Sequence, residues 1–282
     1  MKRYLLIALL LVAGIGLISY PSVASYLSAR NASRITQAYA KKVAGLDPAL
    51  VEQQLKAAQT YNDALAGDPV HDPFIPGSGI VRDQNYARIL DLGSGVMASL
   101  SIPGINVDLP IYHGTSDAVL RRGVGHMEGT SFPIGGKRSH AVLTGHTGLS
   151  DARMFTDLIS LKKGDTFFIH VLGKTLAYKI DKIEVVLPSQ TESLRLVPDQ
   201  DYVTLVTCTP YGINSHRLFV RGTRIPYTPG MEKQAARNRR YPSQEQRLVI
   251  LAAVITAAIM GALIGMVLLF RRRSNKKHPE SA

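Results

Sequence analysis

Cysteine is almost missing from this 282-residue chain, and tryptophan is missing altogether. The single thiol, Cys208, has no partner for an intrachain disulfide, so a fold held together by disulfides is excluded. Three roles remain for it: a small buried hydrophobe, an intermolecular bridge or a reactive nucleophile. Spacings typical of metal sites are also absent, and Gly135-Gly136-Lys137 lacks the pattern of a phosphate-binding loop. We therefore expect no metal and no other cofactor.

Acidic residues are too few to balance the basic ones. The chain has 33 Lys and Arg but 21 Asp and Glu, which gives a formal net charge of +12. Seven of the basic residues and one of the acidic ones lie in the two terminal tails, so the central part carries only half of this charge. The sequence offers no aromatic platform on which bases would stack. We therefore expect no nucleic-acid partner.

Charged residues are absent from two long apolar runs, at 4–23 and 248–270. Each run is long enough to cross the hydrocarbon core of a membrane, roughly 30 Å, as a helix. Lys and Arg flank the outer end of both, so the positive-inside rule predicts cytoplasmic termini and an exported central domain. A cleaved signal sequence is the alternative for the first run, because Val23-Ala24-Ser25 is a small-residue site. Membrane lipid is an expected partner.

The pattern between these runs divides the chain further. Asp47-Pro48 is typical of a helix start within a helical stretch at 31–65, and the proline- and glycine-rich residues 71–79 predict an exposed loop. The expected organisation is a membrane anchor or signal at 1–25, a helical region with that loop at 26–82, a β-rich domain at 83–228, a basic stalk at 229–247, a second membrane helix at 248–270 and a cytoplasmic basic tail at 271–282.

Apolar, β-branched runs dominate the middle of the chain and predict an all-β barrel or sandwich. Gly173-Lys174 is a two-residue hairpin signal, and Asp151–Leu161 is the one helical stretch among the runs. We expect about eight strands, at Ala87–Leu92, Val96–Ile102, Val107–Ile111, Ala141–Thr144, Thr166–Leu172, Thr175–Leu187, Tyr202–Thr207 and Arg217–Ile225.

Two of these strands end in residues suited to chemistry. Cys208 follows one of them directly, and Arg217 opens the next apolar run nine residues later. Among eight histidines, His146 ends an apolar run within the glycine-flanked turn Gly145–Gly148, which mirrors the placement of Cys208, although an ordinary loop histidine fits the same pattern. His216 is the rival base, but adjacent strand side chains face opposite ways, so His216 and Arg217 should not share a site.

The segment Thr204–Leu218, TLVTCTPYGINSHRL, resembles the signature of sortases, the membrane-tethered cysteine transpeptidases of Gram-positive cell surfaces. Leu143-Thr144-Gly145-His146 matches the histidine motif of that family. The likeness covers roughly residues 83–227. It implies an eight-stranded sortase-type β-barrel as the catalytic domain, with N-terminal helices before it and a transmembrane helix at each end.

The resemblance also implies roles for three residues. Cys208 becomes the nucleophile, His146 the general acid and base, and Arg217 the group that stabilises the oxyanion. Each residue type suits its role, because acyl transfer needs a thiolate, a proton donor for the departing amine and a fixed positive charge near the developing oxyanion. Whether Cys208 and His146 rest as a neutral or an ionic pair stays open.

The stretch Asp72-Pro73-Phe74 resembles the lid of class C sortases, which polymerise pilins and carry a second membrane helix. The lid would place an acidic residue against a cation such as Arg217 and a ring over the thiol, although a plain loop is the simpler interpretation of a tripeptide. Thr-Pro-Tyr-Gly-x-Asn after Cys208 also fits class C, whereas Thr147 stands where arginine is more frequent.

A class C sortase implies a defined reaction and partners. It would cleave an LPxTG-type signal of an exported pilin or surface protein between Thr and Gly, and pass the thioacyl group from Cys208 to an acceptor pilin lysine. Alternatives are a housekeeping-type sortase that uses a cell-wall precursor as acceptor, and a non-catalytic pilus-assembly adaptor. A papain-like hydrolase fits poorly, because its histidine would follow the cysteine. The expected location is the outer face of a Gram-positive cell membrane.

Overall fold

The computed structural model describes residues 2–65, 67, 71–75, 83–238 and 244–275. The chain forms two compact units, one made of Met1–Tyr26 with Pro242–Ala282 and the other of Leu27–Tyr241. The expected loop residues 76–79, the stalk residues 239–243 and the tail residues 276–282 lie outside the described residues.

The described residues of the smaller unit are helical. This unit contains the first part of α1 (Lys2–Ala44) together with α6 (Gln244–Asn275), and these helices include the apolar runs 4–23 and 248–270. The side chains at 2–9, 11–12, 244–245, 262–264 and 266–275 are not among those described. Within the described part, no helix meets the length and apolarity that a membrane crossing requires.

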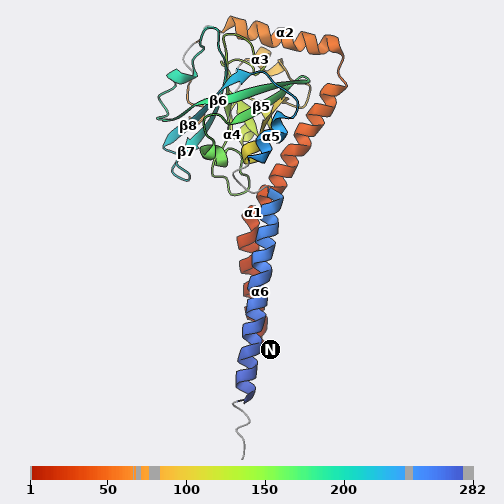
Figure 1. Ribbon diagram of the computed structural model, residues 1–282, viewed down its shortest axis with the longest axis vertical. Helices are drawn as coiled ribbons and strands as arrows, with labels where there is room; N and C mark the ends of the chain where they lie inside the picture. Colours follow the sequence, from red (N-terminus) through yellow and green to blue (C-terminus); the bar gives the residue numbers. More distant parts are fainter. Residues whose placement is uncertain (1, 66, 68–70, 76–82, 239–243, 276–282) are drawn as a thin grey trace, which may run out of the picture. The chain divides into compact units, whose positions relative to one another are not determined.

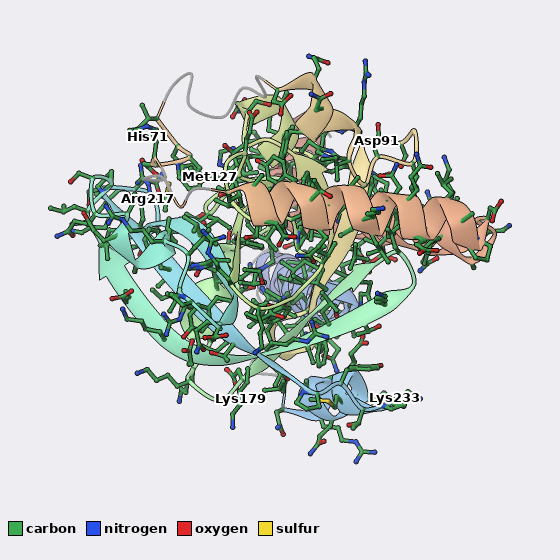
Figure 2. The ribbon with its side chains drawn as sticks, turned by 90° about the horizontal axis from the view of Figure 1, so that it is seen from above. His71, Asp91, Met127, Lys179, Arg217 and Lys233 are labelled. Atoms are coloured by element: carbon green, nitrogen blue, oxygen red, sulfur yellow. The ribbon has the colours of Figure 1, made fainter. Side chains whose placement is uncertain are left out.

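The end of α1 and the whole of α2 (Pro48–Ala64) come before the barrel in the larger unit. α2 begins where the sequence predicts, because the Asp47 side chain accepts a hydrogen bond from Ala49 N at 2.9 Å and a proline occupies the first turn. The end of α1 is tied to the barrel by Tyr39, whose hydroxyl donates to Met97 O at 2.8 Å and accepts from Leu172 N at 3.1 Å. α2 lies across one end of the barrel (Figures 1 and 2).

Eight strands close into a barrel in the order β1-β2-β3-β4-β7-β8-β6-β5. The strand pairs β2–β3 and β4–β7 are parallel and the others are antiparallel. This confirms the eight-stranded barrel. The strands are β1 (Val96–Ile102), β2 (Val107–His113), β3 (Val124–His126), β4 (Ser139–Thr144), β5 (Thr166–Val171), β6 (Lys174–Val186), β7 (Asp201–Thr209) and β8 (His216–Ile225).

The barrel interior is filled by large apolar side chains. Phe167 and Tyr178, a cross-strand pair of β5 and β6, are fully buried and their rings stack. Burying a side chain of this size contributes about 1.5–3 kcal/mol to folding. A second apolar cluster of Met127, Val142, Leu194, Val206 and Phe219 lies on the neighbouring strands and receives Phe74.

The expected strand Ala87–Leu92 is wrong. This stretch overlaps the short helix α3 (Gln84–Arg88), which begins because the Asp83 side chain accepts from Asn85 N at 2.8 Å. Leu90 then takes a positive φ of 63°, which no strand tolerates. The sequence pattern also misses β3, whose three residues are too few to show an alternation.

Glycine makes β3 possible. A Cβ at Gly125 would lie 2.4 Å from Gly114 O, closer than real side chains come. The chain before it forms the short helix α4 (Asp117–Leu120). The same Cβ would lie 2.9 Å from Cδ2 of Leu120, so α4 packs closely against β3.

The connections differ from the sequence expectations in detail. The β5–β6 hairpin forms, but its two turn residues are Leu172 and Gly173, with φ of 44° and 78°, one position earlier than expected. Within the expected helix Asp151–Leu161 only a 3-10 helix, η2 (Thr156–Ser160), is present. The remaining short elements are η1 (Pro103–Ile105), η3 (Glu192–Leu194) and α5 (Met231–Arg237), the last within the expected stalk.

Candidate active site

Cys208 and Arg217 face each other across two neighbouring strands. They are register partners in the antiparallel pair of β7 and β8, near the end of β7 where the chain turns. Cys208 is partly buried and Arg217 is buried, with 8% of its surface exposed. The structure therefore brings together two of the candidates that the sequence places nine residues apart.

His146 is brought to the same edge by the parallel pairing of β4 with β7. The ladder runs to the pair Thr144 and Val206, and it continues through Gly145 N, which donates to Val206 O at 3.0 Å. His146 and Cys208 thus stand at equivalent positions, each two residues beyond the last pair. The strand ends therefore place His146 and Cys208 at the same edge of the barrel.

The turn that carries His146 is closely packed. Thr207 Oγ1 donates to Gly145 O at 2.7 Å, and Phe155 N donates to His146 O at 3.0 Å. A Cβ at Gly145 would lie 2.7 Å from the Phe155 ring. Only glycine fits at position 145 without displacing the Phe155 ring. The packing therefore fixes the backbone position of His146.

Arg217 is occupied by a carboxylate from a distant part of the chain. Asp72 accepts from Arg217 Nε at 2.8 Å and from Nη2 at 2.7 Å, a bidentate pair whose carboxylate side chain is 1% exposed. Arg217 Nη1 donates to the carbonyls of Asn214 and His216, both at 3.0 Å. All three nitrogens of the guanidinium, Nε, Nη1 and Nη2, are therefore engaged within the protein.

Phe74 lies between Arg217 and His146. The guanidinium carbon of Arg217 is 5.1 Å from the centre of the Phe74 ring, and the rings of Phe74 and His146 are 6.0 Å apart at their centres. Figure 2 shows Arg217 and His71 on the same side of the molecule, away from Lys179 and Lys233. The segment from Asp72 to Phe74, with the buried Pro73 between them, is thus docked on the barrel edge that holds Cys208.

Burial shifts the pKa values of the two reacting groups apart. Burial raises the pKa of Cys208; the positive charge of Arg217 opposes this, and the carboxylate of Asp72 adds to it. Burial lowers the pKa of His146, which the carboxylate of Asp117 opposes only in part. A neutral thiol and a neutral imidazole are therefore the resting forms at neutral pH while Asp72–Phe74 is docked.

Arg217 keeps its charge in this setting. Burial acts to lower its pKa, but the carboxylate of Asp72 and, where the thiol is ionised, Cys208 act in the opposite sense and prevail, so its pKa is raised. A permanent positive charge is suited to stabilise an oxyanion.

His216, the rival base, makes a different contact. Its Nδ1 lies 2.9 Å from the hydroxyl of Ser215, in the exposed part of the turn before β8. Its register partner is Thr209, one position beyond Cys208. The ring contact with Phe74 and the β4–β7 pairing both favour His146 as the base at this edge.

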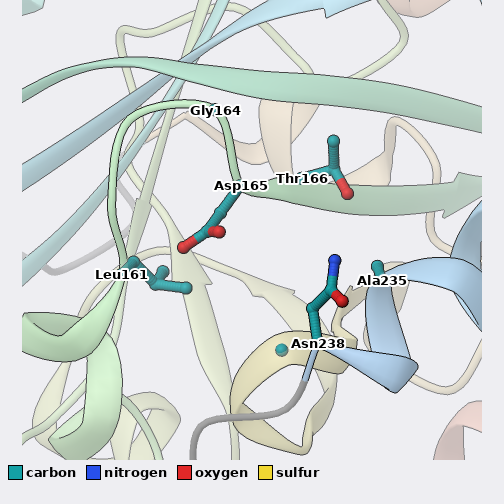
Figure 3. Close-up of a pocket in the computed structure, with 7 residues that line it drawn as sticks. Leu161, Gly164, Asp165, Thr166, Ala235 and Asn238 are labelled. Atoms are coloured by element: carbon teal, nitrogen blue, oxygen red, sulfur yellow. The ribbon is translucent and has the colours of Figure 1, made fainter.

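Two cavities among the described residues of the larger unit are lined by residues other than the candidates. One of about 70 Å³ lies between the β5 entry and α5, lined by Leu161, Asp165 and Asn238 among others (Figure 3). Another of about 470 Å³ lies between α1 and the strands β1 and β5, on the side of the barrel opposite β7. Among the described residues no group of three His, Cys, Asp or Glu side chains is placed to hold a metal ion.

Comparison with known proteins agrees with this geometry. Residues 100–225 match the family model of the sortase domain. Sortase C-1 from Streptococcus pneumoniae is 47% identical, the match covers 69% of this chain and 100% of that one, and the TM-score is 0.66. The chain is a class C member of the sortase family. This sortase is accordingly a cysteine transpeptidase, as the resemblance at Thr204–Leu218 predicts.

Two further proteins are similar in sequence to this sortase, to different degrees. A pilus-related sortase C of Group B Streptococcus is 42% identical, covering 68% of this chain and 97% of that one, with a TM-score of 0.64. Sortase A of Streptococcus agalactiae serotype III is 26% identical over 210 residues, which are 73% of this chain and 78% of that protein. Sequence similarity is thus higher to the class C structure than to this sortase A.

One residue at the site of this sortase carries no signal in the sequence. Asp117, in α4, has its Oδ1 3.4 Å from Nε2 of His146. It precedes His146 by 29 residues and belongs to a helix of a single turn, so neither spacing nor periodicity points to it.

Proposed function

We propose that this sortase cleaves an LPxTG-type sorting signal between Thr and Gly and transfers the new acyl group to a lysine amine of a pilin subunit. The observation that carries the proposal is the cross-strand pair of Cys208 and Arg217, with His146 at the equivalent position of the parallel strand. The lysine acceptor is supported by the similarity to the pilus-related sortase C of Group B Streptococcus.

In the first half-reaction Cys208 transfers its proton to His146 and attacks the carbonyl carbon of the threonine. The carbonyl oxygen becomes an oxyanion, which the guanidinium of Arg217 stabilises. The carbon–nitrogen bond to glycine then breaks, and the imidazolium of His146 gives its proton to the departing amine. The product is a thioester between threonine and Cys208.

In the second half-reaction a lysine amine attacks the thioester. His146 accepts the proton that the amine loses, and Arg217 again stabilises the oxyanion. The carbon–sulfur bond breaks, the proton returns to the sulfur of Cys208, and a threonine–lysine isopeptide bond is left. Water in place of lysine would give hydrolysis, so acceptor binding decides between the two outcomes.

The segment Asp72-Pro73-Phe74 acts as a lid in this proposal. The bidentate pair between Asp72 and Arg217 supports it, because the guanidinium cannot bind an oxyanion through the two nitrogens that Asp72 holds. The ring of Phe74 covers the edge between Arg217 and His146. The apparent affinity for a peptide is then reduced by the fraction of molecules with an open lid.

The proposal also includes the placement of the enzyme. The catalytic domain at 83–228 works on the outer face of a Gram-positive cell membrane, with both termini in the cytoplasm. It is supported by the uncharged runs 4–23 and 248–270 and by the Lys and Arg that flank their outer ends.

The test is a transfer assay with the full chain in detergent micelles. An LPxTG peptide is incubated with a lysine-containing pilin peptide or with oligoglycine, which stands for a cell-wall acceptor, and the products are identified by mass spectrometry. A lysine-linked product and a thioacyl adduct on Cys208 are expected. Cleavage by Cys208→Ala, with the parent assayed beside it, would overturn the proposal, and preferential transfer to oligoglycine would favour the housekeeping-type reaction.

A further inference from the structure

The imidazole of His146 has one nitrogen that is buried and unsatisfied. Among the described residues Nε2 has no hydrogen-bond partner, although it is shielded from solvent. Leaving a buried polar atom unpaired is costly, so such an atom calls for an explanation. The nearest explanation is the carboxylate of Asp117, whose Oδ1 is 3.4 Å away, just beyond normal hydrogen-bond length.

The carboxylate of Asp117 is held with one oxygen directed elsewhere. Arg121, one turn further along the chain, donates from Nε to Asp117 Oδ2 at 2.8 Å. The other oxygen, Oδ1, is the one that lies beside His146 Nε2. Arg121 thus orients the carboxylate so that its second oxygen faces the imidazole.

The backbone on which Asp117 stands is firmly placed. Ser116 O accepts from Val119 N and from Leu120 N, both at 2.9 Å, and Leu120 is buried. Leu120 packs so closely against β3 that a Cβ at Gly125 would lie 2.9 Å from its Cδ2. A shift of a few tenths of an ångström in two side chains is then enough to bring Asp117 and His146 to hydrogen-bond distance, as in other active sites that tighten around substrate.

We propose that Asp117 is a positioning residue for His146: its Oδ1 accepts the proton of Nε2 and so leaves Nδ1 to exchange a proton with Cys208. This inference rests on the acid–base role proposed above for His146. Asp117 acts through the ring that it orients, not as a donor or acceptor to the reacting atoms. A neutral imidazole with its proton on Nε2 has its free lone pair on Nδ1, which is the form that can accept the thiol proton.

Several charges besides Asp117 lie around the ring. Arg121 opposes the carboxylate and acts to lower the pKa of His146. Arg217 and Asp72 form a close ion pair with each other, so their charges largely cancel. Cys208 is neutral at rest for the reason given above. Asp117 is therefore the one nearby carboxylate, among the described residues, that favours the imidazolium.

The decisive experiment compares Asp117→Asn with Asp117→Glu in the full chain in detergent micelles. The Cε1 signal of His146 is followed by NMR against pH in protein with labelled histidine, and His146→Gln identifies the signal. Asp117→Asn should lower the pKa of His146, and Asp117→Glu should restore it in part. The matched control is Asp151→Asn, which removes an exposed carboxylate that faces Arg121 and should leave the pKa unchanged.

Turnover gives a second readout. Because the pKa of His146 lies below that of Cys208, His146 sets the acid limb of kcat/KM. In Asp117→Asn that limb should move to lower pH, and kcat/KM near pH 7 should fall about twofold to fivefold, as for an exposed ion pair. Thermal unfolding should match the parent, because Asp117 is exposed.

The outcomes separate this inference from the proposed function. An unchanged pKa of His146 in Asp117→Asn, or an equal shift in Asp151→Asn, would overturn the role of Asp117 even if the parent cleaves peptide normally. A parent that cleaves no sorting-signal peptide would instead contradict the proposed function. The NMR titration needs no turnover, so it decides the positioning role in that case as well.

Discussion

Asp72 and Arg217 are 145 residues apart in the chain, yet two hydrogen bonds of 2.8 and 2.7 Å join them. Their side chains are 1% and 9% exposed, so solvent screens the pair very little. A buried bidentate pair of this kind is stable only while both partners are present, because either charge alone would be costly to bury. The pair therefore couples the position of one loop to the availability of one guanidinium.

We expect Asp72→Ala combined with Phe74→Ala to expose the thiol. Hydrogen bonds to charged groups contribute about 1.5–3 kcal/mol, so alkylation of Cys208 should become about tenfold faster or more. Iodoacetamide labelling followed by mass spectrometry measures the rate. Ile75→Ala is the matched control, because this neighbouring side chain is half exposed. Equal alkylation rates in the double variant and the parent, both folded, would show that the segment is no lid over Cys208.

Arg217→Lys should lose most of the transfer activity. Lysine keeps the positive charge, but it lacks the planar fork that contacts Asp72, Asn214 and His216 at once. Loss of one oxyanion donor typically lowers kcat by roughly 10²-fold, which a peptide-cleavage assay detects easily. The melting temperature serves as the control for folding. If Arg217→Lys cleaved the peptide at the parent rate, a group other than the guanidinium of Arg217 would have to stabilise the oxyanion.

Much of the barrel edge at Cys208 can be predicted from the sequence, because β7 and β8 are long apolar runs and the thiol and Arg217 lie at their ends. β3 cannot be predicted in this way, since a strand of three residues with a central glycine shows no alternation. The stretch Ala87–Leu92 misleads for the opposite reason: its apolar residues suit a strand, but the Asp83 cap starts a helix there.

Some contacts at the site can be anticipated from the sequence, and others cannot. The meeting of Asp72 with Arg217 is anticipated only through the resemblance to a family lid, since no local pattern spans 145 residues. The neighbourhood of Asp117 and His146 depends on how α4 packs against Gly125, which is a tertiary contact. Local patterns thus reveal strand ends, whereas the groups that surround them are set by packing.

Asn62→Ala should destabilise the barrel without changing the chemistry. The buried Asn62 side chain accepts from Phe132 N at 2.7 Å and donates to Phe132 O at 3.2 Å. Its loss leaves the buried Phe132 N unpaired, at about 1–3 kcal/mol, while Phe132 O keeps the hydrogen bond from Ile134 N at 2.8 Å. A melting temperature lower by roughly 5–10 °C is expected, measured by calorimetry. Gln59→Ala on the exposed face of the same helix should change it little, and an equal drop in both variants would contradict this account.

Acid should unfold the barrel through two buried histidines. Burial lowers the pKa of His126 to about 3 and that of His140 to about 4. Both rings are therefore neutral in the folded protein at pH values where the unfolded chain would bind protons. The stability that this gives is complete above the ordinary histidine pKa near 6.5, and it is lost progressively as the pH falls towards 3.

Burial makes a second proton on His140 costly, although its hydrogen bond to Arg195 O acts in the opposite sense. Arg195 O, 2.9 Å from Nδ1, can only accept, so Nδ1 carries the proton and Nε2 accepts from the Thr204 hydroxyl at 2.7 Å. A second proton on Nε2 would make the Thr204 hydroxyl turn to accept and would place a positive charge in a buried site. Urea unfolding between pH 7 and 4 should show the free energy of unfolding falling by a few kcal/mol. In His140→Gln the slope against pH should be smaller, whereas the exposed His71→Gln should keep the slope of the parent; equal slopes in all three proteins would assign the acid sensitivity to other groups.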